Sequence, residues 1–362
     1  MKTLENLKTL QPLQQLKHLD INGLIAKLPI IQGGMGVGVS MSRLAGAVAC
    51  EGGVGVISAA QPGFNWDGFA SNPLKTNLEA LAYHITRAKE KAKDGLIGVN
   101  IMCAINHYAE YVKCAIENKA DLIISGAGLP TKLPELVKGS ATRIAPIVSS
   151  KKAAAVLLKM WDKKFHKTAD MVVIEGPKAG GHLGFSAEDL QHELDYDREV
   201  LDILQEVSHY SERYNRTIPT VFAGGVCDRT DVDHYMGLGC AGVQVATKFV
   251  ATEECDVADA YKQAYISATD DDVTIVKSPV GMPGRALNNE FIKGLLTTNS
   301  KITECSSCIS GCNPKTIPYC ITKALINAAV GKTSEGLVFC GAYVGRVKEI
   351  GSVKGVLQEL IG

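Results

Sequence analysis

Short apolar runs recur along the chain, and each is followed by a longer stretch whose apolar residues have helical spacing. Near-continuous apolar runs without polar alternation are typical of strands buried on both faces of a parallel sheet. The stretches between them are long enough for helices, so the pattern predicts repeated strand–helix units. The eight runs cover residues 28–31, 53–57, 96–101, 120–124, 143–148, 171–174, 218–222 and 241–245.

Eight strand–helix units in succession predict a (βα)8 TIM barrel, which belongs to the α/β class. A doubly wound open sheet is the alternative, but the count of eight and the absence of an early dinucleotide-binding fingerprint favour the closed barrel. We expect residues 1–27 to form an N-terminal extension and residues 28–280 the barrel. Residues 281–362 are then a C-terminal segment with a cysteine-containing insertion packed on the barrel.

Other elements are expected around these units. The spacing predicts helices over residues 74–93, 186–214 and 322–329. Glu188 and Asp189 lie near the start of the second of these, where acidic residues suit a helix N-terminus. Residues 272–280 are expected to be extended, and residues 281–285 to form a turn rich in glycine and proline.

Composition and charge narrow the class of protein. The 38 Lys and Arg residues balance 38 Asp and Glu residues, so the net charge is zero and a nucleic-acid-binding protein is disfavoured. No apolar run reaches the roughly 18 residues that a membrane span needs, and residues 1–20 lack the apolar core of a secretory signal. We therefore expect a cytoplasmic protein with no nucleic-acid or membrane partner, whose 11 cysteines are reduced.

Candidate chemistry lies just after the predicted strands, because (βα)8 barrels place their reacting groups at the C-terminal ends of the strands. Residues 32–38, after the first strand, read Gln-Gly-Gly-Met-Gly-Val-Gly. Glycines at this point let the backbone approach a flat ligand and offer it N–H donors. A plain glycine-rich turn is the alternative.

Two further motifs predict a phosphate site. Ala223-Gly224-Gly225 follows the seventh strand, and residues 242–247 along the eighth read Gly-Val-Gln-Val-Ala-Thr. Barrels often bind phosphate with the loops after strands seven and eight, and Thr247 adds a hydroxyl donor. The chain has no Walker A sequence, which disfavours a nucleoside triphosphate, so a phosphate-bearing cofactor is the better interpretation.

One histidine stands in a glycine-rich loop after the sixth strand. Residues 175–184 read Glu-Gly-Pro-Lys-Ala-Gly-Gly-His-Leu-Gly. Because histidine titrates near neutral pH, His182 is a candidate general acid or base. The alternative is a loop histidine bonded to a backbone carbonyl, and for the other histidines, mostly on polar helical stretches, we prefer such a structural role.

Taken in order, these motifs resemble those of the nitronate monooxygenase (2-nitropropane dioxygenase-like) family and of its relative, the flavin-dependent enoyl-acyl-carrier-protein reductase II. The resemblance covers roughly residues 25–290 and rests on the glycine motifs after strands one, six, seven and eight. It implies a (βα)8 barrel that binds FMN at its C-terminal face.

The resemblance also implies roles for individual residues. His182 matches the family's catalytic histidine, and Lys178 stands where relatives commonly carry an acidic residue. That lysine either favours an anionic substrate or a reduced anionic flavin, or points to solvent. The implied cofactor contacts are Gly33, Gly34 and Met35 against the isoalloxazine ring, Asn100 at its polar edge, Glu175, Lys178, Gly180 and Gly181 beside the cofactor, and Ala223, Gly224, Gly225, Gln244, Ala246 and Thr247 around the phosphate.

The implied activity is that of an FMN-dependent oxidoreductase, most directly a nitronate monooxygenase that converts alkyl nitronates with O2 to a carbonyl compound and nitrite. The same constellation suits an NAD(P)H-dependent enoyl reductase acting on an enoyl thioester, or another flavin reductase. A flavin- or cysteine-based redox sensor is the non-enzyme alternative. The partner is then a small-molecule substrate, and the oligomeric state stays open, with a homodimer among the options.

Four of the cysteines fall in one short segment. Cys305, Cys308, Cys312 and Cys320 have the spacing Cys-x2-Cys-x3-Cys-x7-Cys, and the glycine and prolines around them keep the segment non-helical. Four thiolates this close suit a tetrahedral zinc site or an iron–sulfur cluster. A reduced loop without metal, near the active site, is the alternative.

Overall fold

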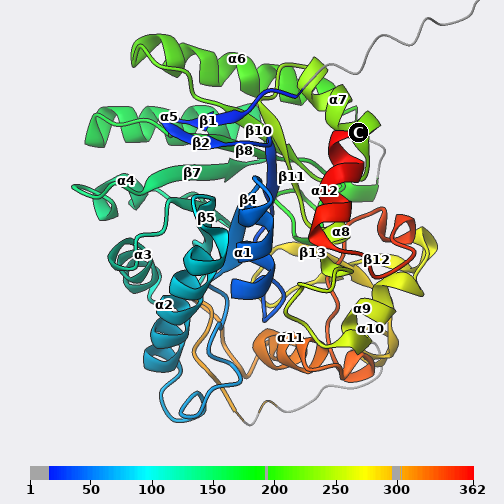
Figure 1. The fold of residues 1–362 in the computed structure, drawn as a ribbon. Coiled ribbons are helices and arrows are strands. Elements are labelled where there is room, and N and C mark those ends of the chain that lie inside the picture. The colour runs from blue at the N-terminus through cyan, green and yellow to red at the C-terminus, as the bar shows by residue number, and fades with distance from the viewer. Residues whose placement is uncertain (1–15, 192–194, 296–301, 303) are drawn as a thin grey trace, which may run out of the picture.

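Eight parallel strands close into a barrel in the computed structural model, which describes residues 16–191, 195–295, 302 and 304–362 (Figure 1). Around the barrel the order is β10, β11, β3, β4, β5, β6, β7 and β8. The strands are β3 (Ile30–Gln32), β4 (Val54–Ser58), β5 (Leu96–Met102), β6 (Leu122–Gly126), β7 (Arg143–Val148), β8 (Val172–Glu175), β10 (Thr220–Ala223) and β11 (Gly242–Val245). The predicted (βα)8 barrel is confirmed.

The closure of the barrel rests on the pairing of its first and last strands. Val243 in β11 lies opposite Ile30 in β3, and Val245 opposite Gln32, in parallel register. An open sheet would leave these two edges unpaired, so the alternative of a doubly wound sheet is wrong. The strands are almost wholly buried, β4 along its full length, which explains why the apolar runs revealed them.

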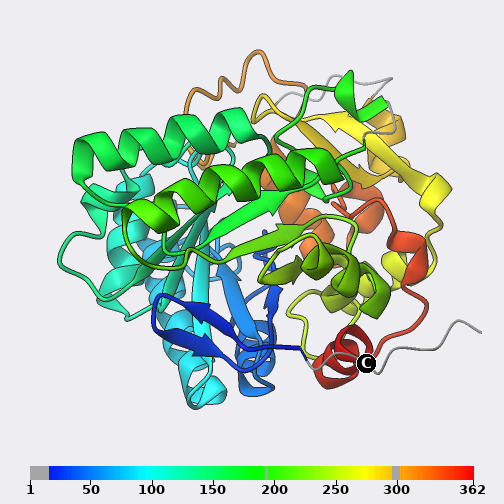
Figure 2. The same cartoon turned by 90° about the horizontal axis from the view of Figure 1, so that it is seen from above.

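Helices cover the outside of the barrel, as Figure 2 shows from above. Close packing requires glycine in places: a Cβ added to Gly55 in β4 would lie 1.8 Å from the Ala45 carbonyl oxygen in α1. The helices between strands are α1 (Ser42–Cys50), α2 (Pro73–Ala92), α3 (Tyr108–Glu117), α4 (Leu133–Leu136), α5 (Lys151–Phe165), α6 (Asp197–Arg213) and α7 (Arg229–Gly237), and the short α8 (Thr247–Val250) follows β11.

One predicted helix starts later than expected. The helix expected over residues 186–214 is α6, which begins only at Asp197. Ser186 instead opens a separate turn, because its backbone N–H and its hydroxyl both donate to the Asp189 carboxylate, at 3.2 and 2.7 Å. The short 3-10 helix η1 (Asp189–Gln191) follows, and residues 192–194 lie outside the described residues.

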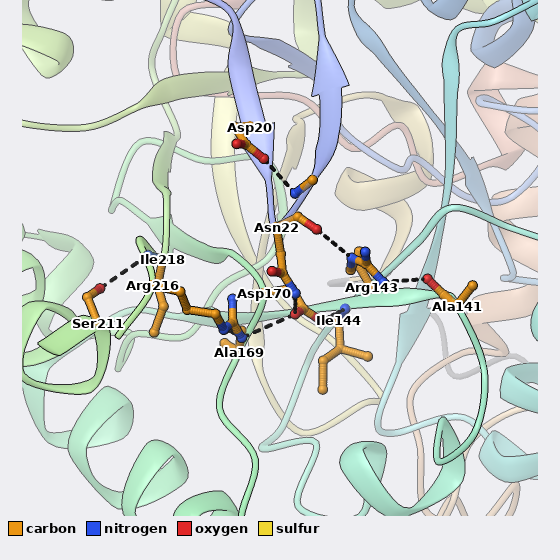
Figure 3. A network of polar contacts seen from close by, with 11 residues as sticks. Asp20, Asn22, Ala141, Arg143, Ile144, Ala169, Asp170, Ser211, Arg216 and Ile218 are labelled. Carbon is orange, nitrogen blue, oxygen red and sulfur yellow. Dashed lines mark hydrogen bonds and ion pairs between the residues drawn. The ribbon is translucent and has the colours of Figure 1, made fainter. Parts of the chain in front are cut away.

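An N-terminal hairpin covers the bottom of the barrel. Strands β1 (Leu19–Ile21) and β2 (Leu24–Ala26) pair antiparallel, and their buried side chains join the cluster inside the barrel. In Figure 3 the Asn22 amide donates to the Asp170 carboxylate at 2.8 Å, and the Arg143 side chain donates to the Asn22 carbonyl oxygen at 3.0 Å. Asp170 also accepts from Arg216 at 3.2 Å, so the hairpin is tied to the strand starts.

The C-terminal part of the chain builds a second, smaller sheet on the opposite end. Strand β13 (Pro283–Leu287) pairs with β12 (Val273–Lys277) on one side and with β9 (Gly181–His182) on the other. The turn expected over residues 281–285 is therefore wrong beyond Met282, because Gly284 and Arg285 pair with the His182 loop. The remaining elements are α9 (Asp259–Ile266), η2 (Asp270–Asp272), α10 (Glu290–Leu295), α11 (Ile321–Ala329), η3 (Thr333–Glu335), η4 (Val344–Arg346) and α12 (Val353–Ile361).

Within the described ranges, none of the helices combines the length and the apolar character that crossing a membrane would require.

Candidate active site

A cavity of about 230 Å³ opens at the C-terminal ends of the barrel strands. Its walls come from the segments that follow β3, β5, β8, β10 and β11, together with the C-terminal residues Phe339–Tyr343. Every residue predicted to contact a cofactor or to act in catalysis lines this cavity: Gly33, Gly34, Met35, Asn100, Glu175, Lys178, Gly180, Gly181, His182, Ala223, Gly224, Gly225, Gln244, Ala246 and Thr247. The structure thus brings the set together, and the individual roles stay predictions.

Two glycines make part of the cavity wall from bare backbone. A Cβ added to Gly34 would lie 2.3 Å from Cβ of Asn100, and one added to Gly180 would lie 2.5 Å from the carbonyl group of Cys340. Any side chain at either position would collide with its neighbour. A ligand in the cavity therefore meets peptide groups there rather than side chains.

The turn after β10 has a conformation that favours glycine. Gly224 and Gly225 have φ values of +111° and +84°, and a Cβ on Gly225 would lie 3.0 Å from Cβ of Lys178. The Thr247 hydroxyl, at the start of α8, accepts a hydrogen bond from the Gly341 N–H at 3.1 Å. The loops after strands seven and eight therefore meet the C-terminal segment at one end of the cavity.

One polar atom in the wall has no partner. The side-chain oxygen of Gln244 is buried and makes no hydrogen bond within the described residues. A buried acceptor without a partner costs free energy, about 1–3 kcal/mol. A ligand that donates an N–H or O–H at this point would relieve that cost.

His182 lies on β9 with its ring held from two sides. Its Nε2 is 2.7 Å from Oγ of the buried Ser278, and its ring meets the edge of Phe339 with centroids 5.0 Å apart. Burial lowers the pKa of His182 to about 4, so the imidazole is neutral at pH 7. Sequence reasoning missed Ser278, because it falls in a segment expected only to be extended.

Glu175 ends β8 beneath the same loop. Its carboxylate accepts the N–H of Gly184 at 3.0 Å. Burial raises the pKa of Glu175 to about 7, against the opposing effects of that hydrogen bond and of the Arg285 guanidinium. The cavity thus holds one neutral base and one carboxyl group that titrates near neutrality.

Lys178 is exposed, but its side chain packs against Tyr343 and does not extend freely into solvent. Its ammonium group lies 4.8 Å from the centre of the Tyr343 ring and donates to the Tyr343 hydroxyl. The Arg346 guanidinium lies over the same ring, 4.4 Å from its centre. Two cations are therefore gathered beside Gly225 and Tyr343, at one end of the cavity.

The contribution of the C-terminal segment to the site was hard to foresee. Arg285 donates to the carbonyl oxygens of Pro177, at 2.7 Å, and of Ala179, and so fixes the loop that carries Lys178. The Ala342 N–H donates to the Lys178 carbonyl oxygen at 3.1 Å. The only sequence signal is the pair Gly341-Ala342 between aromatic residues, which is too common to identify a site.

The four clustered cysteines give a different outcome. All are free, and across the described ranges no group of three or more His, Cys, Asp or Glu side chains is arranged to hold a metal ion. Burial raises the pKa of the Cys308 thiol, and the nearby Cys320 and Cys312 add to the rise. The converged site predicted for Cys305, Cys308, Cys312 and Cys320 is not found, and metal binding by them stays a prediction.

A glycine-lined cavity with a half-buried neutral histidine, at the C-terminal ends of eight parallel strands, places the protein among the (βα)8-barrel enzymes. Its family within that class is also clear. The chain belongs to the nitronate monooxygenase family, whose family model matches residues 19–362. The resemblance inferred from the motifs is confirmed.

Individual relatives are distant. A (3aS,4S,5R,7aS)-5-hydroxy-7a-methyl-1-oxo-octahydro-1H-indene-4-carboxyl-CoA dehydrogenase of Rhodococcus jostii is 27% identical over 267 residues, which cover 74% of this chain and 64% of that protein. This chain therefore spans less than two thirds of that relative's length. A probable nitronate monooxygenase of Staphylococcus haemolyticus is 28% identical over 288 residues, covering 73% of this chain and 76% of that protein.

Among solved structures, FabK of Thermotoga maritima superposes with a TM-score of 0.70 and 27% sequence identity. The match covers 92% of this chain and 91% of that one. The likeness therefore includes the C-terminal part as well as the barrel.

Proposed function

We propose that this protein is an FMN-dependent oxidoreductase that acts on alkyl nitronates, releasing a carbonyl compound and nitrite with O2 as oxidant. The single observation that carries the proposal is the convergence of four glycine-bearing loops and His182 on one cavity at the C-terminal face. Membership of the nitronate monooxygenase family supports the same reaction class.

The residues of the cavity fit FMN. The bare backbone at Gly34 and Gly180 leaves a wall suited to a flat ring, and the unpartnered Gln244 oxygen matches a ligand that carries N–H or O–H donors, as flavin and its ribityl chain do. Gly224, Gly225 and Thr247 would hold the phosphate, with Lys178 supplying positive charge beside them. When bound, flavin supplies the capacity to accept and pass on electrons.

The chain's own contribution is to orient the substrate and to control one proton. His182 is neutral, so it can accept a proton from an uncharged nitroalkane or donate an N–H to an anionic nitronate. The hydrogen bond to Ser278 and the contact with the edge of Phe339 hold the imidazole ring in one orientation. The ring is therefore already positioned when the substrate binds.

A second candidate is a reductase that uses NAD(P)H and an enoyl thioester. The match to FabK over 92% of the chain favours it, as does the similarity to a dehydrogenase of a CoA thioester. In this case His182 would position the acceptor or help to protonate it.

An anaerobic absorbance titration of the purified protein separates the two candidates. We expect ethyl nitronate to bleach the flavin bands, and air to restore them with release of nitrite. Separate samples are titrated with NADH and with NADPH before the nitronate is tested. Rapid bleaching of the flavin by either nucleotide would support the reductase in place of the monooxygenase.

Two results would contradict the proposal outright. A preparation that holds no FMN, even after incubation with the free cofactor, would remove the basis of both candidates. Retained FMN that neither nitronate nor pyridine nucleotide reduces would favour the redox-sensor alternative.

A further inference from the structure

A second cavity, of about 380 Å³, adjoins the first beyond His182. The two cavities share Ala60, Met102, His182 and Leu325 in their walls, so they meet at the histidine. The second cavity extends away from the glycine loops toward the start of α2, the loop after β5, and the cysteine segment. Its volume lies within the range typical of pockets for medium-sized organic ligands, and far exceeds what a two-carbon nitronate needs.

The cysteine segment forms one wall of this second cavity. Cys305 to Ile309 line it, and the segment is fastened to the loop after β5. Ile309 bridges to Ile105, the Asn106 N–H donates to the Cys308 carbonyl oxygen at 3.1 Å, and the Asn106 side chain donates to the Ser307 carbonyl oxygen at 2.7 Å. The wall is thus held by contacts that do not involve the thiols.

The described residues that line the second cavity include no Asp, Glu, Lys or Arg. A ligand with a fixed charge would find no dedicated counter-charge there, and its desolvation would not be compensated. The two histidines of the lining do not change this. Burial keeps the pKa of His182 near 4, and the exposed His107 is already paired with the Glu110 carboxylate at 3.4 Å. The cavity therefore favours an uncharged ligand.

The amide side chains of the lining are already engaged in holding the walls together. Asn77 donates to Gln61 at 2.7 Å and accepts from the Gly63 N–H at 3.0 Å, and Asn72 caps α2 by accepting from the Lys75 N–H at 3.2 Å. The surface left for a ligand is divided about equally between polar and apolar atoms, and its apolar part includes Leu74, Ile105, Tyr111, Ile309, Ile321 and Leu325.

We propose that the second cavity binds the non-reacting body of the substrate, and that this body is an uncharged chain or ring system with the reacting group at its His182 end and its apolar part against the apolar side chains of the lining. The cysteine segment then acts as a specificity-determining wall. This inference rests on the proposed function for the identity of the reacting group, but the shape and charge of the cavity stand independently of it.

A series of primary alkyl nitronates, from ethyl to octyl, tests the proposal on the FMN-loaded protein. Each methylene that is fully buried against apolar side chains contributes about 0.8 kcal/mol, which is about a fourfold gain in kcat/KM. We expect octyl nitronate to exceed ethyl nitronate by about tenfold or more, since only part of the chain is fully enclosed.

Two pairs of variants locate the effect. Leu74→Trp at the start of α2 and Ser306→Trp in the cysteine segment each introduce bulk into the second cavity, and should reduce the ratio of octyl to ethyl kcat/KM to near one. Lys75→Trp and Ser310→Trp place the same side chain on the same two segments at exposed positions outside the lining, and should keep the wild-type ratio. Thermal unfolding of all four checks that the fold is intact.

A binding measurement separates failure of this inference from failure of the proposed function. Calorimetric titration with primary alkanamides, from propanamide to decanamide, reports occupancy of the cavity without turnover. Tighter binding with chain length, abolished by Leu74→Trp, supports the cavity even if no nitronate reduces the flavin. The second-cavity proposal would be overturned if nitronates turn over but kcat/KM and amide affinity are both independent of chain length. It would also be overturned if Ser306→Trp and Ser310→Trp change the ratio of octyl to ethyl kcat/KM equally.

Discussion

His182 and Glu175 are two titratable side chains of one cavity whose burial moves their pKa values in opposite directions. For His182 the neutral form is favoured, with a pKa near 4, and for Glu175 the neutral form is again favoured, with a pKa near 7. Both shifts have the same cause, because burial penalises whichever form carries charge. At neutral pH the cavity thus presents a neutral imidazole and a carboxyl group that titrates in this pH range.

Replacement of His182 should remove most of the turnover. We expect His182→Ala to lower kcat about 10²-fold or more, which is the usual contribution of a positioned acid or base, while the flavin content stays unchanged. His84 supplies a matched control: burial also lowers its pKa to about 4, and it too is bonded to a serine, at 3.0 Å, but it lines neither cavity. His84→Ala should therefore keep the wild-type kcat. Equal activity in His182→Ala and the wild type would end the catalytic assignment.

Glu175 should make cofactor binding depend on pH. Below pH 7 its carboxyl group is neutral, and above pH 7 it adds a negative charge to a cavity proposed to hold a phosphate. We expect the FMN dissociation constant to rise several-fold between pH 6 and pH 8, measured by fluorescence titration of the apoprotein, because each pKa unit corresponds to about 1.4 kcal/mol. Glu175→Gln should flatten this profile, and the same slope in both proteins would assign it to another group.

The stability of the apoprotein should respond to the same group. The folded protein holds the Glu175 proton more tightly than the unfolded chain does, since the pKa is raised from 4.5 to about 7. The contribution of this group to stability is therefore present below pH 4.5 and is lost as the pH rises to 7. Glu175→Gln should remove that decline, which urea unfolding at a series of pH values would measure.

At the scale of elements, the strands of the barrel were predictable from the sequence. The strand pairing in the smaller sheet of β9, β12 and β13 was not. Each of the eight apolar runs overlaps a strand of the barrel, because burial on both faces makes a strand visible as a run of Val, Ile and Leu. Strand β9 is only Gly181 and His182, and its pairing with β13 joins segments about 100 residues apart. Nothing in the alternation of polar and apolar residues encodes such a pairing.

The candidate site shows the same division. The residues on loops after barrel strands were predictable, because the barrel topology dictates where those loops gather. Ser278, Arg285 and the segment Phe339–Tyr343 were not, since they reach the cavity through tertiary packing of the C-terminal part. The division of the chain at residues 27 and 280 stays a prediction, and a site built from both sides of residue 280 shows that the two parts act together.

The turn after β10 carries a prediction of its own. Thr247→Val combined with Gly225→Asp should reduce FMN retention by at least about tenfold, because a carboxylate near the phosphate repels it and the φ of +84° favours glycine. Gly139→Asp is the control, since Gly139 has a similar φ of +82° with no atom within 4 Å of its Cβ position and lies outside the cavity. Full flavin content in the double variant, determined from the absorbance ratio after gel filtration, would refute the phosphate assignment.

At the scale of the whole molecule, the two ends of the barrel have separate tasks. One end is sealed by the hairpin and its network around Asp170, which Figure 3 shows. The other end carries both cavities. The network at the sealed end contains a buried carboxylate bonded to Asn22, Arg216 and the Ile144 N–H. Substitutions at the sealed end should therefore change stability without changing the cavities.

Removal of the buried carboxylate should destabilise the protein without changing the site. We expect Asp170→Ala to reduce the free energy of unfolding by about 3–5 kcal/mol, because it leaves the mostly buried Arg216 without its counter-charge. As a control, Glu79→Ala breaks the exposed ion pair with Lys75, and should change the free energy of unfolding by less than about 1 kcal/mol. Urea unfolding measures both, and the flavin spectrum of each folded variant should match the wild type.

The lining contributed by Phe339–Tyr343 has a consequence for the order in which the protein matures. Chains are made from the N-terminus, and early parts begin to fold before later parts exist. All eight barrel strands precede residue 246, so the barrel can assemble well before Phe339–Tyr343 leaves the ribosome. The cavity is thus completed by a segment that is synthesised after all the barrel strands, so the full lining exists only once the C-terminal part has been made.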